Sequence, residues 1–410
     1  MAGDRDVTVL RDLARQYADV CAKEIQDERR ELWRKHNSFE RTRPLIYCRW
    51  FACGNELIDP HLECEDPFFR GHERALRHFL YQDTLGDDFI LEPWITVRAA
   101  HVLPPDGLWG VTMGRIPSPE PGGAWMFDPP LKTPEDLHRL VTPRHQIDEE
   151  TTERNVSRLH DAIGDLLAVT VDRAPAWSVW RSDISTDLAQ LRGLEQMMWD
   201  MVDNPDWLHE LLAFMRDGIL AAHQQAEDAG DWRLCDHQNQ AMPYANELAD
   251  PKPNGEPVTR KQLWVFCASQ ETTEVSPAMF DEFMLQYQIP IIRRFGLSAY
   301  GCCEDLTHKI GVLRQIPNLR RIAVTPWADV ARCAEQIGTD YILSWRPSPA
   351  EQVCTGFDAD FVRRSIAQGL DACRGCHVDI TLKDIETVHS DPGRLRGWVS
   401  TVREVAERYA

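Results

Sequence analysis

Residues 319–345 read LRRIAVTPWADVARCAEQIGTDYILSW, and the alternation of patterns in this stretch defines the fold class. It holds two apolar runs, Leu319 to Thr325 and Tyr341 to Trp345, separated by a helical pattern over Trp327 to Ile337. A second helical pattern, Asp358 to Ala372, leads to a third apolar run, Val378 to Leu382. Strands that alternate with helices in this way are typical of a parallel sheet.

Shorter apolar runs extend the alternation toward the N-terminus, at Leu166 to Val171 and Trp232 to Cys235. Polar side chains follow the runs, and in a closed barrel the loops after the strands build the site. We therefore predict an α/β chain with a single (β/α)8 TIM-type barrel. An open doubly wound sheet is the alternative, but no G-x-G-x-x-G motif follows a strand.

The first part of the chain lacks this alternation. Residues 7–37 carry the pattern of a long charged helix, and residues 104–130 are rich in Pro and Gly, as loops are. We therefore divide the 410 residues into an N-terminal helical and loop extension, 1–130, and a (β/α)8 barrel, 131–410.

The composition excludes some classes of partner. The chain has 45 Lys and Arg against 65 Asp and Glu, a net charge of −20. Nucleic acids and anionic membranes attract basic surfaces, so neither is expected as a partner. No apolar stretch is long enough to span a membrane, and the N-terminus lacks the apolar segment of a secretory signal. We predict a cytoplasmic protein whose twelve cysteines are reduced.

Two adjacent cysteines and a carboxylate, Cys302, Cys303 and Glu304, follow Tyr300, where a barrel strand is expected to end. Thiolates bind zinc well, and a carboxylate or histidine can complete the metal site. Cys303 is therefore a candidate zinc ligand or nucleophile, with a buried free cysteine as the alternative. The sequence does not choose between Cys302 and Cys303, because a one-residue shift exchanges which of them faces the barrel mouth.

Further candidate ligands and acid–base groups follow other strands. His237 is a candidate nitrogen ligand or general acid–base group, with a loop histidine bonded to backbone as the alternative. Glu271 is a second candidate ligand and could equally be a helix cap. Lys383 and Asp384 follow a strongly apolar strand, where a buried ion pair is costly unless it serves a function. Both are therefore candidate catalytic residues, together with Glu304.

Candidate substrate-binding residues are aromatic or can bind an anion. Arg346 could bind a substrate carboxylate through its planar fork, with a surface salt bridge as the alternative. Three tryptophans, Trp264, Trp327 and Trp345, are expected to line an apolar pocket that excludes water. The polar Asn239 is the remaining candidate.

Five short motifs together resemble one known superfamily. They are Tyr300 to Glu304 (YGCCE), Ile316 to Arg321 (IPNLRR), Pro326 to Asp329 (PWAD), Arg346 to Pro349 (RPSP) and Lys383-Asp384. The chain resembles the uroporphyrinogen decarboxylase-like proteins, which include zinc methyltransferases that move methyl groups between corrinoid proteins and thiols such as coenzyme M. The likeness is strongest over residues 260–400, looser over 160–235 and weak over the first 130, and its motifs are typical of one subgroup. It implies a (β/α)8 barrel with an N-terminal helical extension.

Two departures from the superfamily pattern concern the metal and the substrate. The thiol methyltransferases carry His-x-Cys at one strand end and another Cys at the last strand end. In this chain Gly301 occupies the position of the His, and Lys383-Asp384 follows the last strand in place of the Cys. Replacement zinc ligands would have to come from His237, Glu271 or Glu304. The decarboxylases hold an octacarboxylate with an Arg-rich N-terminal loop, for which the segment Tyr47 to Trp50 offers one Arg. Porphyrinogen decarboxylation is therefore disfavoured.

The resemblance and the residues together favour a methyltransferase. Zinc bound by Cys303 would hold a small substrate thiol as its thiolate, and the methyl group would come from a corrinoid (cobalamin) protein or another donor. The alternative is a metal-free decarboxylase or lyase acting on a small carboxylated substrate, in which the cations of the site stabilise an anion. A non-catalytic binding barrel is the third reading, and the many polar strand ends disfavour it. A homodimer is also expected, since isologous dimers are common among soluble enzymes.

Overall fold

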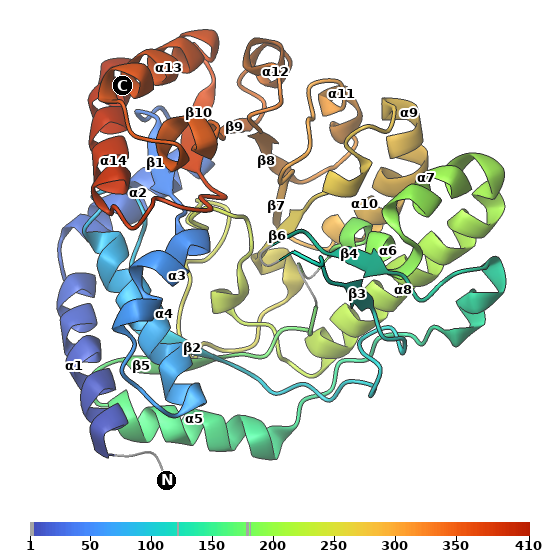
Figure 1. Cartoon of the computed structure of the whole chain (residues 1–410), viewed down its shortest axis with the longest axis horizontal. Helices are drawn as coiled ribbons and strands as arrows, with labels where there is room; N and C mark the ends of the chain where they lie inside the picture. The colour runs from blue at the N-terminus through green and yellow to red at the C-terminus, as the bar shows by residue number, and fades with distance from the viewer. Residues whose placement is uncertain (1–3, 121–122, 178–179, 181) are drawn as a thin grey trace.

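A six-stranded parallel sheet forms the centre of the molecule in the computed structural model, which describes residues 4–120, 123–177, 180 and 182–410. The sheet curves, and helices line its outer side (Figure 1). The strand order is β1 (Leu45–Cys48), β10 (His377–Leu382), β9 (Ile342–Trp345), β8 (Leu319–Val324), β7 (Leu297–Tyr300) and β6 (Trp264–Cys267). All neighbouring strands in this sheet run parallel, so their carboxyl ends meet at one edge.

Two more parallel strands form a sheet of their own, in which β2 (Trp94–Arg98) pairs with β5 (Ala168–Asp172). The segment expected as a strand between β5 and β6 is a 3₁₀ turn, η4 (Leu234–Asp236). There the Asp236 carboxylate accepts the Arg233 backbone N–H, and such side-chain capping competes with strand pairing. The described residues therefore form an α/β fold whose parallel strands are divided between two sheets, and a closed eight-stranded ladder is not formed among them.

The first 130 residues contribute to the same architecture. β1 pairs with β10 along its whole length, and β2 pairs with β5. The single helix expected over 7–37 is two helices, separated by a turn at residues 22–24. The segment that we divided off as an extension therefore supplies two of the parallel strands. It also holds part of an antiparallel hairpin, β3 (Gly114–Ile116) with β4 (Met126–Asp128).

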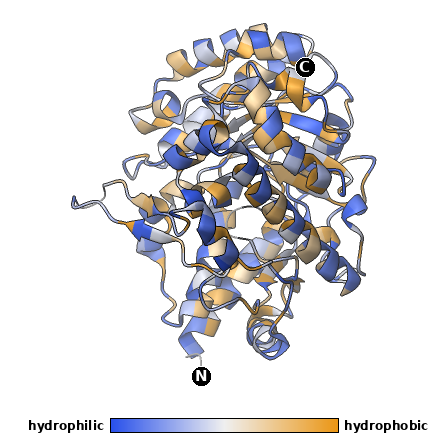
Figure 2. Cartoon of the chain, turned by 90° about the vertical axis from the view of Figure 1, so that its right-hand side faces the viewer, coloured by the Kyte–Doolittle hydropathy of each residue, from blue (hydrophilic) through white to orange (hydrophobic). Residues whose placement is uncertain are grey.

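The α-helices mostly bury one face and expose the other, so hydrophilic and hydrophobic residues are mixed along them (Figure 2), although the helix over Ser185–Arg192 is buried on almost every side. They are α1 (Asp4–Cys21), α2 (Ile25–Asn37), α3 (Gly54–Leu57), α4 (Pro67–Asp83), α5 (Glu149–Ile163), α6 (Ser185–Arg192), α7 (Leu194–Asp203), α8 (Pro205–Asp228), α9 (Pro277–Phe280), α10 (Gln286–Ile292), α11 (Ile310–Leu313), α12 (Val330–Ile337), α13 (Ala359–Ala372) and α14 (Gly393–Ala406). None of those in the described part of the chain combines the length and apolar character that crossing a membrane requires.

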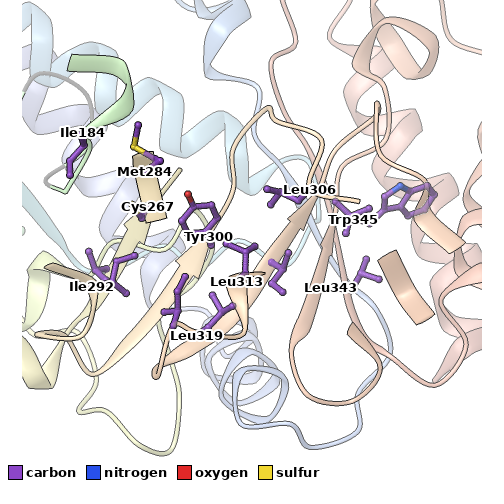
Figure 3. Packing of buried hydrophobic residues seen from close by; sticks show 14 of the residues in the cluster. Ile184, Cys267, Met284, Ile292, Tyr300, Leu306, Leu313, Leu319, Leu343 and Trp345 are labelled. Atoms are coloured by element: carbon purple, nitrogen blue, oxygen red, sulfur yellow. The ribbon is translucent and has the colours of Figure 1, made fainter. Parts of the chain in front are cut away.

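Helix α13 shows how this outer layer packs on the sheet. Its buried residues Val362, Ile366 and Gly369 recur every three or four positions and form one face. Gly369 lies directly against the indole of Trp345 in β9, because a Cβ atom at Gly369 would stand 2.1 Å from that ring. Trp345 therefore points outward from the strand into the hydrophobic core (Figure 3). Since neighbouring strand residues point to opposite faces, Ser344 lies on the inner side.

The inner side of the sheet holds a buried charge network centred on Asp379 of β10. Ser344 Oγ donates to Asp379 Oδ1 at 2.8 Å, and Arg321 Nη2 donates to Asp379 Oδ2 at 2.7 Å. The Nε2 atom of His36 in α2 lies 3.3 Å from the same Oδ2. Burial raises the pKa of Asp379, but the Arg321 charge and the hydrogen bonds from His36 and Ser344 outweigh it and lower that pKa to about 2. The network ties α2 to three strands of the sheet.

Candidate functional site

A small cavity opens where β7, β8, β9 and β10 end. These strands are adjacent in the sheet, so the residues that follow them converge. The cavity measures about 280 Å³ and is lined by Cys302, Cys303, Pro326, Trp327, Arg346, Pro347, Ser348, Pro349, Ala350, Lys383 and Asp384. Six of these residues were candidates from the sequence, and the tertiary structure brings them into one place.

A lysine ammonium contacts both sulfurs from one side. Lys383 Nζ is 3.2 Å from Cys303 Sγ and 3.7 Å from Cys302 Sγ, and the sulfurs are 3.6 Å apart. Lys383 also donates to the Asp384 carboxylate and is 6% exposed, so its charge is directed into the site rather than into solvent. Asp384 holds a left-handed φ of 57°, a conformation that non-glycine residues adopt at some cost and that often marks functional sites.

A second cation, Arg346, is buried beside Cys302. It is 4% exposed, and it donates through Nη1 to the Cys302 carbonyl and through Nη2 to Gln240 Oε1 at 2.9 Å. Both acceptors are neutral oxygens, and Arg346 Nε has no hydrogen-bond partner among the described residues. A buried guanidinium without a carboxylate partner is costly unless another anion faces it. The nearby sulfur of Cys302 can supply that negative charge.

Gln240 belongs to the site, although the sequence analysis singled out its neighbour Asn239. Gln240 Nε2 donates to Cys302 Sγ at 3.6 Å while its Oε1 accepts from Arg346, so one amide bridges the thiol and the guanidinium. Its φ of 60° is left-handed. Asn239 uses its amide within its own loop, accepting from Ala241 N at 2.8 Å and donating to the Met242 carbonyl at 3.2 Å. The two side chains carry the same amide group, so the sequence does not show which of them reaches the site.

The surroundings make Cys302 the more acidic thiol of the pair. The hydrogen bond from the Cys303 thiol lowers the pKa of Cys302 most, burial opposes this effect, and the charges of Arg346 and Lys383 lower it further, to about 6. The same shared hydrogen bond and burial raise the pKa of Cys303. The surroundings therefore favour a single negative charge on the pair, with Cys302 as the preferred thiolate and Cys303 as its hydrogen-bond donor.

Gly301 and Glu304 place the two cysteines. Gly301 has a φ of 101°, and a Cβ atom there would lie 2.7 Å from Leu306 Cδ1, so a histidine would not fit this position. The Glu304 carboxylate is 1% exposed and accepts the backbone N–H groups of Cys302 at 2.7 Å and Ser269 at 2.8 Å. Glu304, a candidate catalytic group from the sequence, therefore acts in this structure by positioning the Cys302 backbone.

The four candidate zinc ligands do not come together. His237 Nδ1 accepts the Trp264 backbone N–H at 3.1 Å, and burial lowers the pKa of His237 to about 4. Glu271 accepts the hydroxyls of Ser185 and Thr186, both at 2.7 Å, at the start of α6. His237 thus binds backbone, which was its alternative, whereas Glu271 binds two side-chain hydroxyls rather than capping a helix. Within the described ranges, no group of three His, Cys, Asp or Glu side chains is placed to hold a metal ion. The donor set at the cysteine pair does not fit zinc, and a lysine cation faces both sulfurs.

Of the three candidate tryptophans, Trp327 lines the cavity. It is 78% exposed and forms part of the rim. Trp264 is 1% exposed and donates its indole N–H to the Pro243 carbonyl, and Trp345 packs under α13. Trp345 points to the outer layer of its strand and therefore cannot reach the inner mouth. Trp264 is the first residue of β6, so it lies at the amino end of the strand, away from the mouth.

Comparison with known proteins supports the fold. No family model matches the chain, and no curated protein matches it. Among solved structures, it is similar to a methyltransferase from Methanosarcina mazei, with a TM-score of 0.52 and 12% sequence identity over 92% of this chain and 97% of that one. The chain therefore has the overall fold of that methyltransferase.

Replacing Lys383 tests its contact with the sulfurs. An opposite charge at this distance lowers a pKa by about 1–3 units, so in Lys383→Met the thiolate fraction at pH 6 should fall roughly 10-fold. The rate of Cys302 alkylation by iodoacetamide, followed by mass spectrometry, measures this fraction. Lys132→Met, which removes an exposed lysine paired with Asp128, is the matched control and should keep the wild-type rate. An unchanged rate in Lys383→Met would show that the ammonium does not stabilise the thiolate.

Proposed function

We propose that this protein is a methyltransferase in which Cys302 takes a methyl group from a donor and passes it to a small acceptor. The observation that carries the proposal is the pair of buried cations at Cys302, in the lining of a cavity of about 280 Å³: the Lys383 ammonium contacts the Cys302 sulfur and Arg346 donates to the Cys302 carbonyl. A fold shared with a methyltransferase supports it.

The first step forms a bond between Cys302 Sγ and the methyl carbon. The thiolate supplies the electron pair, and the bond from the methyl carbon to the donor breaks, with its pair leaving on the donor. In the second step the acceptor attacks the same carbon and the Cys302 thiolate leaves. The charges of Arg346 and Lys383 stabilise the thiolate, so they favour it as the leaving group as well as the nucleophile.

The cavity limits what can enter. A small acceptor fits beside the Trp327 ring, and Arg346 Nε offers a buried N–H to an anionic group such as a carboxylate or sulfonate. A corrin macrocycle is far larger than the cavity, so a methylcorrinoid donor would remain outside, on a partner protein, and present only its methyl group at the mouth. The proposal needs no metal at the sulfurs.

The test is to incubate the protein with methylcobalamin or methyl iodide and to digest it. A methyl group on Cys302, detected by mass spectrometry and removed again when a small thiol such as 2-mercaptoethanol is added, is the expected result. Initial rates should then show the ping-pong pattern of a covalent intermediate. Methylation that never leaves Cys302, or none from either donor, would contradict the proposal.

A metal-free lyase or decarboxylase is the second candidate. Arg346 favours it, because its buried Nε has no hydrogen-bond partner in the described part of the chain and a buried cation can stabilise a developing anion. Release of carbon dioxide from small carboxylic acids in the absence of a methyl donor would favour this alternative.

Two broader proposals accompany this function. The first is that the six strands of the large sheet and the pair β2–β5 are the eight strands of one (β/α)8 barrel, without ladder pairing between β1 and β2 or between β5 and β6. The parallel pairing within each of the two sheets supports it. The protein works in the cytoplasm, because all twelve of its cysteines are free thiols, as a reducing compartment keeps them.

A further inference from the structure

Cys303 is the second member of a sulfur pair, and methyl transfer does not use its chemistry. The Cys302 and Cys303 Sγ atoms are 3.6 Å apart and line the same cavity. A disulfide bond is about 2.05 Å long, so closure needs an approach of about 1.5 Å, within reach of side-chain rotation. We propose that Cys302 and Cys303 form a redox-active dithiol that reduces small disulfides by closing to a disulfide between adjacent residues.

The reaction balances in two steps. The Cys302 thiolate attacks one sulfur of a disulfide R–S–S–R, a Cys302–S–R bond forms, and RS⁻ leaves with the electron pair of the broken bond. RS⁻ takes the Cys303 proton and leaves as RSH. The Cys303 thiolate then attacks the Cys302 sulfur and releases a second RS⁻, which solvent protonates. Two electrons pass from the dithiol to the substrate.

Lys383 is placed to serve both steps. Its ammonium is nearer to Cys303 Sγ (3.2 Å) than to Cys302 Sγ (3.7 Å). When Cys302 becomes neutral in the mixed disulfide, this charge stabilises the Cys303 thiolate that has to attack next. The Lys383 ammonium thus stabilises the Cys302 thiolate in the first step and the Cys303 thiolate in the second.

The adjacency of the two cysteines makes the product disulfide easy to reduce again. Cα atoms of neighbouring residues are about 3.8 Å apart across a trans peptide, whereas ordinary disulfides span about 4.4–6.8 Å between Cα atoms. A bond formed across so short a span is strained, and strained disulfides are labile and serve catalysis or regulation rather than stability. Cys303 is exposed, so a reducing thiol can reach it. The pair is therefore suited to turnover.

The cavity sets the substrate class. Cys302 is 6% exposed and is reached through a space of about 280 Å³, so only a low-molecular-weight disulfide can present its sulfur to Cys302. Oxidation of the pair also removes the thiolate that methyl transfer needs. A cycle of oxidation and reduction would then switch the proposed methyl transfer off and on.

The experiment treats the fully reduced protein with 4,4′-dithiodipyridine, with no methyl donor present. The wild type should release two more equivalents of pyridinethione than Cys302→Ser/Cys303→Ser, and its Cys302–Cys303 peptide should lose two hydrogens in mass. Cys303→Ser should release one equivalent and keep a pyridylthio group on Cys302. Cys376→Ser removes a half-buried thiol elsewhere, and its Cys302–Cys303 peptide should lose two hydrogens as the wild-type peptide does.

A wild-type peptide that keeps one or two pyridylthio groups, or that stays fully reduced, would overturn the proposal. Circular dichroism tests whether each variant is folded. If the double variant does not fold, the peptide masses of the wild type and of Cys303→Ser decide the question without it. This experiment detects a disulfide, whereas the methyl-transfer assay detects a methylated sulfur. Either proposal can therefore be refuted without refuting the other.

Discussion

Cys302→Ser is expected to abolish methylation of the site and to lower methyl transfer at pH 7 at least about 100-fold, because a serine hydroxyl remains protonated and is a weak nucleophile. The assay is transfer from methylcobalamin or methyl iodide to 2-mercaptoethanol. The side chains differ by one atom, so the fold should be retained. Cys376→Ser, outside the cavity, is the matched control and should retain activity.

The pH dependence of the wild type gives an independent check of the same residue. The thiolate is the reactive form and its fraction rises with pH, so alkylation of Cys302 should reach half its maximal rate near pH 6. An ordinary cysteine would reach it near pH 8.5. A midpoint between pH 8 and 9 would show that the surrounding charges do not act on Cys302, and the methyl-transfer proposal would then lose its main support.

Asp379→Asn is expected to lower the free energy of unfolding by about 3–5 kcal/mol, since it leaves the buried Arg321 without its counter-charge. Urea denaturation at pH 7 measures this loss. The matched control is Asp340→Asn, which breaks an exposed ion pair with Arg314 and should cost about 0–1 kcal/mol. Equal losses in the two variants would mean that the Asp379 network contributes no more than a surface pair.

The sign of the pH effect follows from the lowered pKa of Asp379. Its folded pKa of about 2 is below the value of about 3.9 in an unfolded chain, so its contribution is fully present above pH 4 or so. The contribution is lost as the pH falls toward 2. The difference in stability between wild type and Asp379→Asn should therefore shrink over this range. A difference that stays constant down to pH 2 would argue against the ionised carboxylate.

The parallel strands could be predicted from the sequence where the apolar runs are continuous. Such runs occur because both faces of the sheet are covered there. The runs at 319–325, 341–345 and 378–382 correspond to β8, β9 and β10 within a residue or two. The prediction failed at Trp232 to Cys235, because the capping bond between Asp236 and Arg233 depends on side-chain geometry that apolar periodicity does not record. It also placed the first strands in an extension, since pairing such as that of β1 with β10 joins residues more than 300 positions apart.

Part of the candidate site could also be predicted from the sequence. Residues that directly follow strands, such as Cys302, Arg346 and Lys383, converge because parallel strands bring their carboxyl ends to one edge. Whether residues of this kind form a metal site depends on the conformation of the loops that carry them, because the loops set the positions of the ligand side chains. His237 and Glu271 were expected at the sulfurs, but backbone and hydroxyl groups hold them elsewhere.

The sequence alone determined the α/β class, the parallel direction of the strands and the thiols, cations and carboxylate at their ends, since each of these depends on local order along the chain. Only the tertiary structure decided that a lysine ammonium contacts two sulfurs, that Arg346 is buried with no carboxylate partner among the described residues, and that Gln240 bonds both Cys302 and Arg346. Electrostatic interactions act through space over a few ångströms, and the hydrogen bonds that join these groups link residues 44 to 106 positions apart in the sequence.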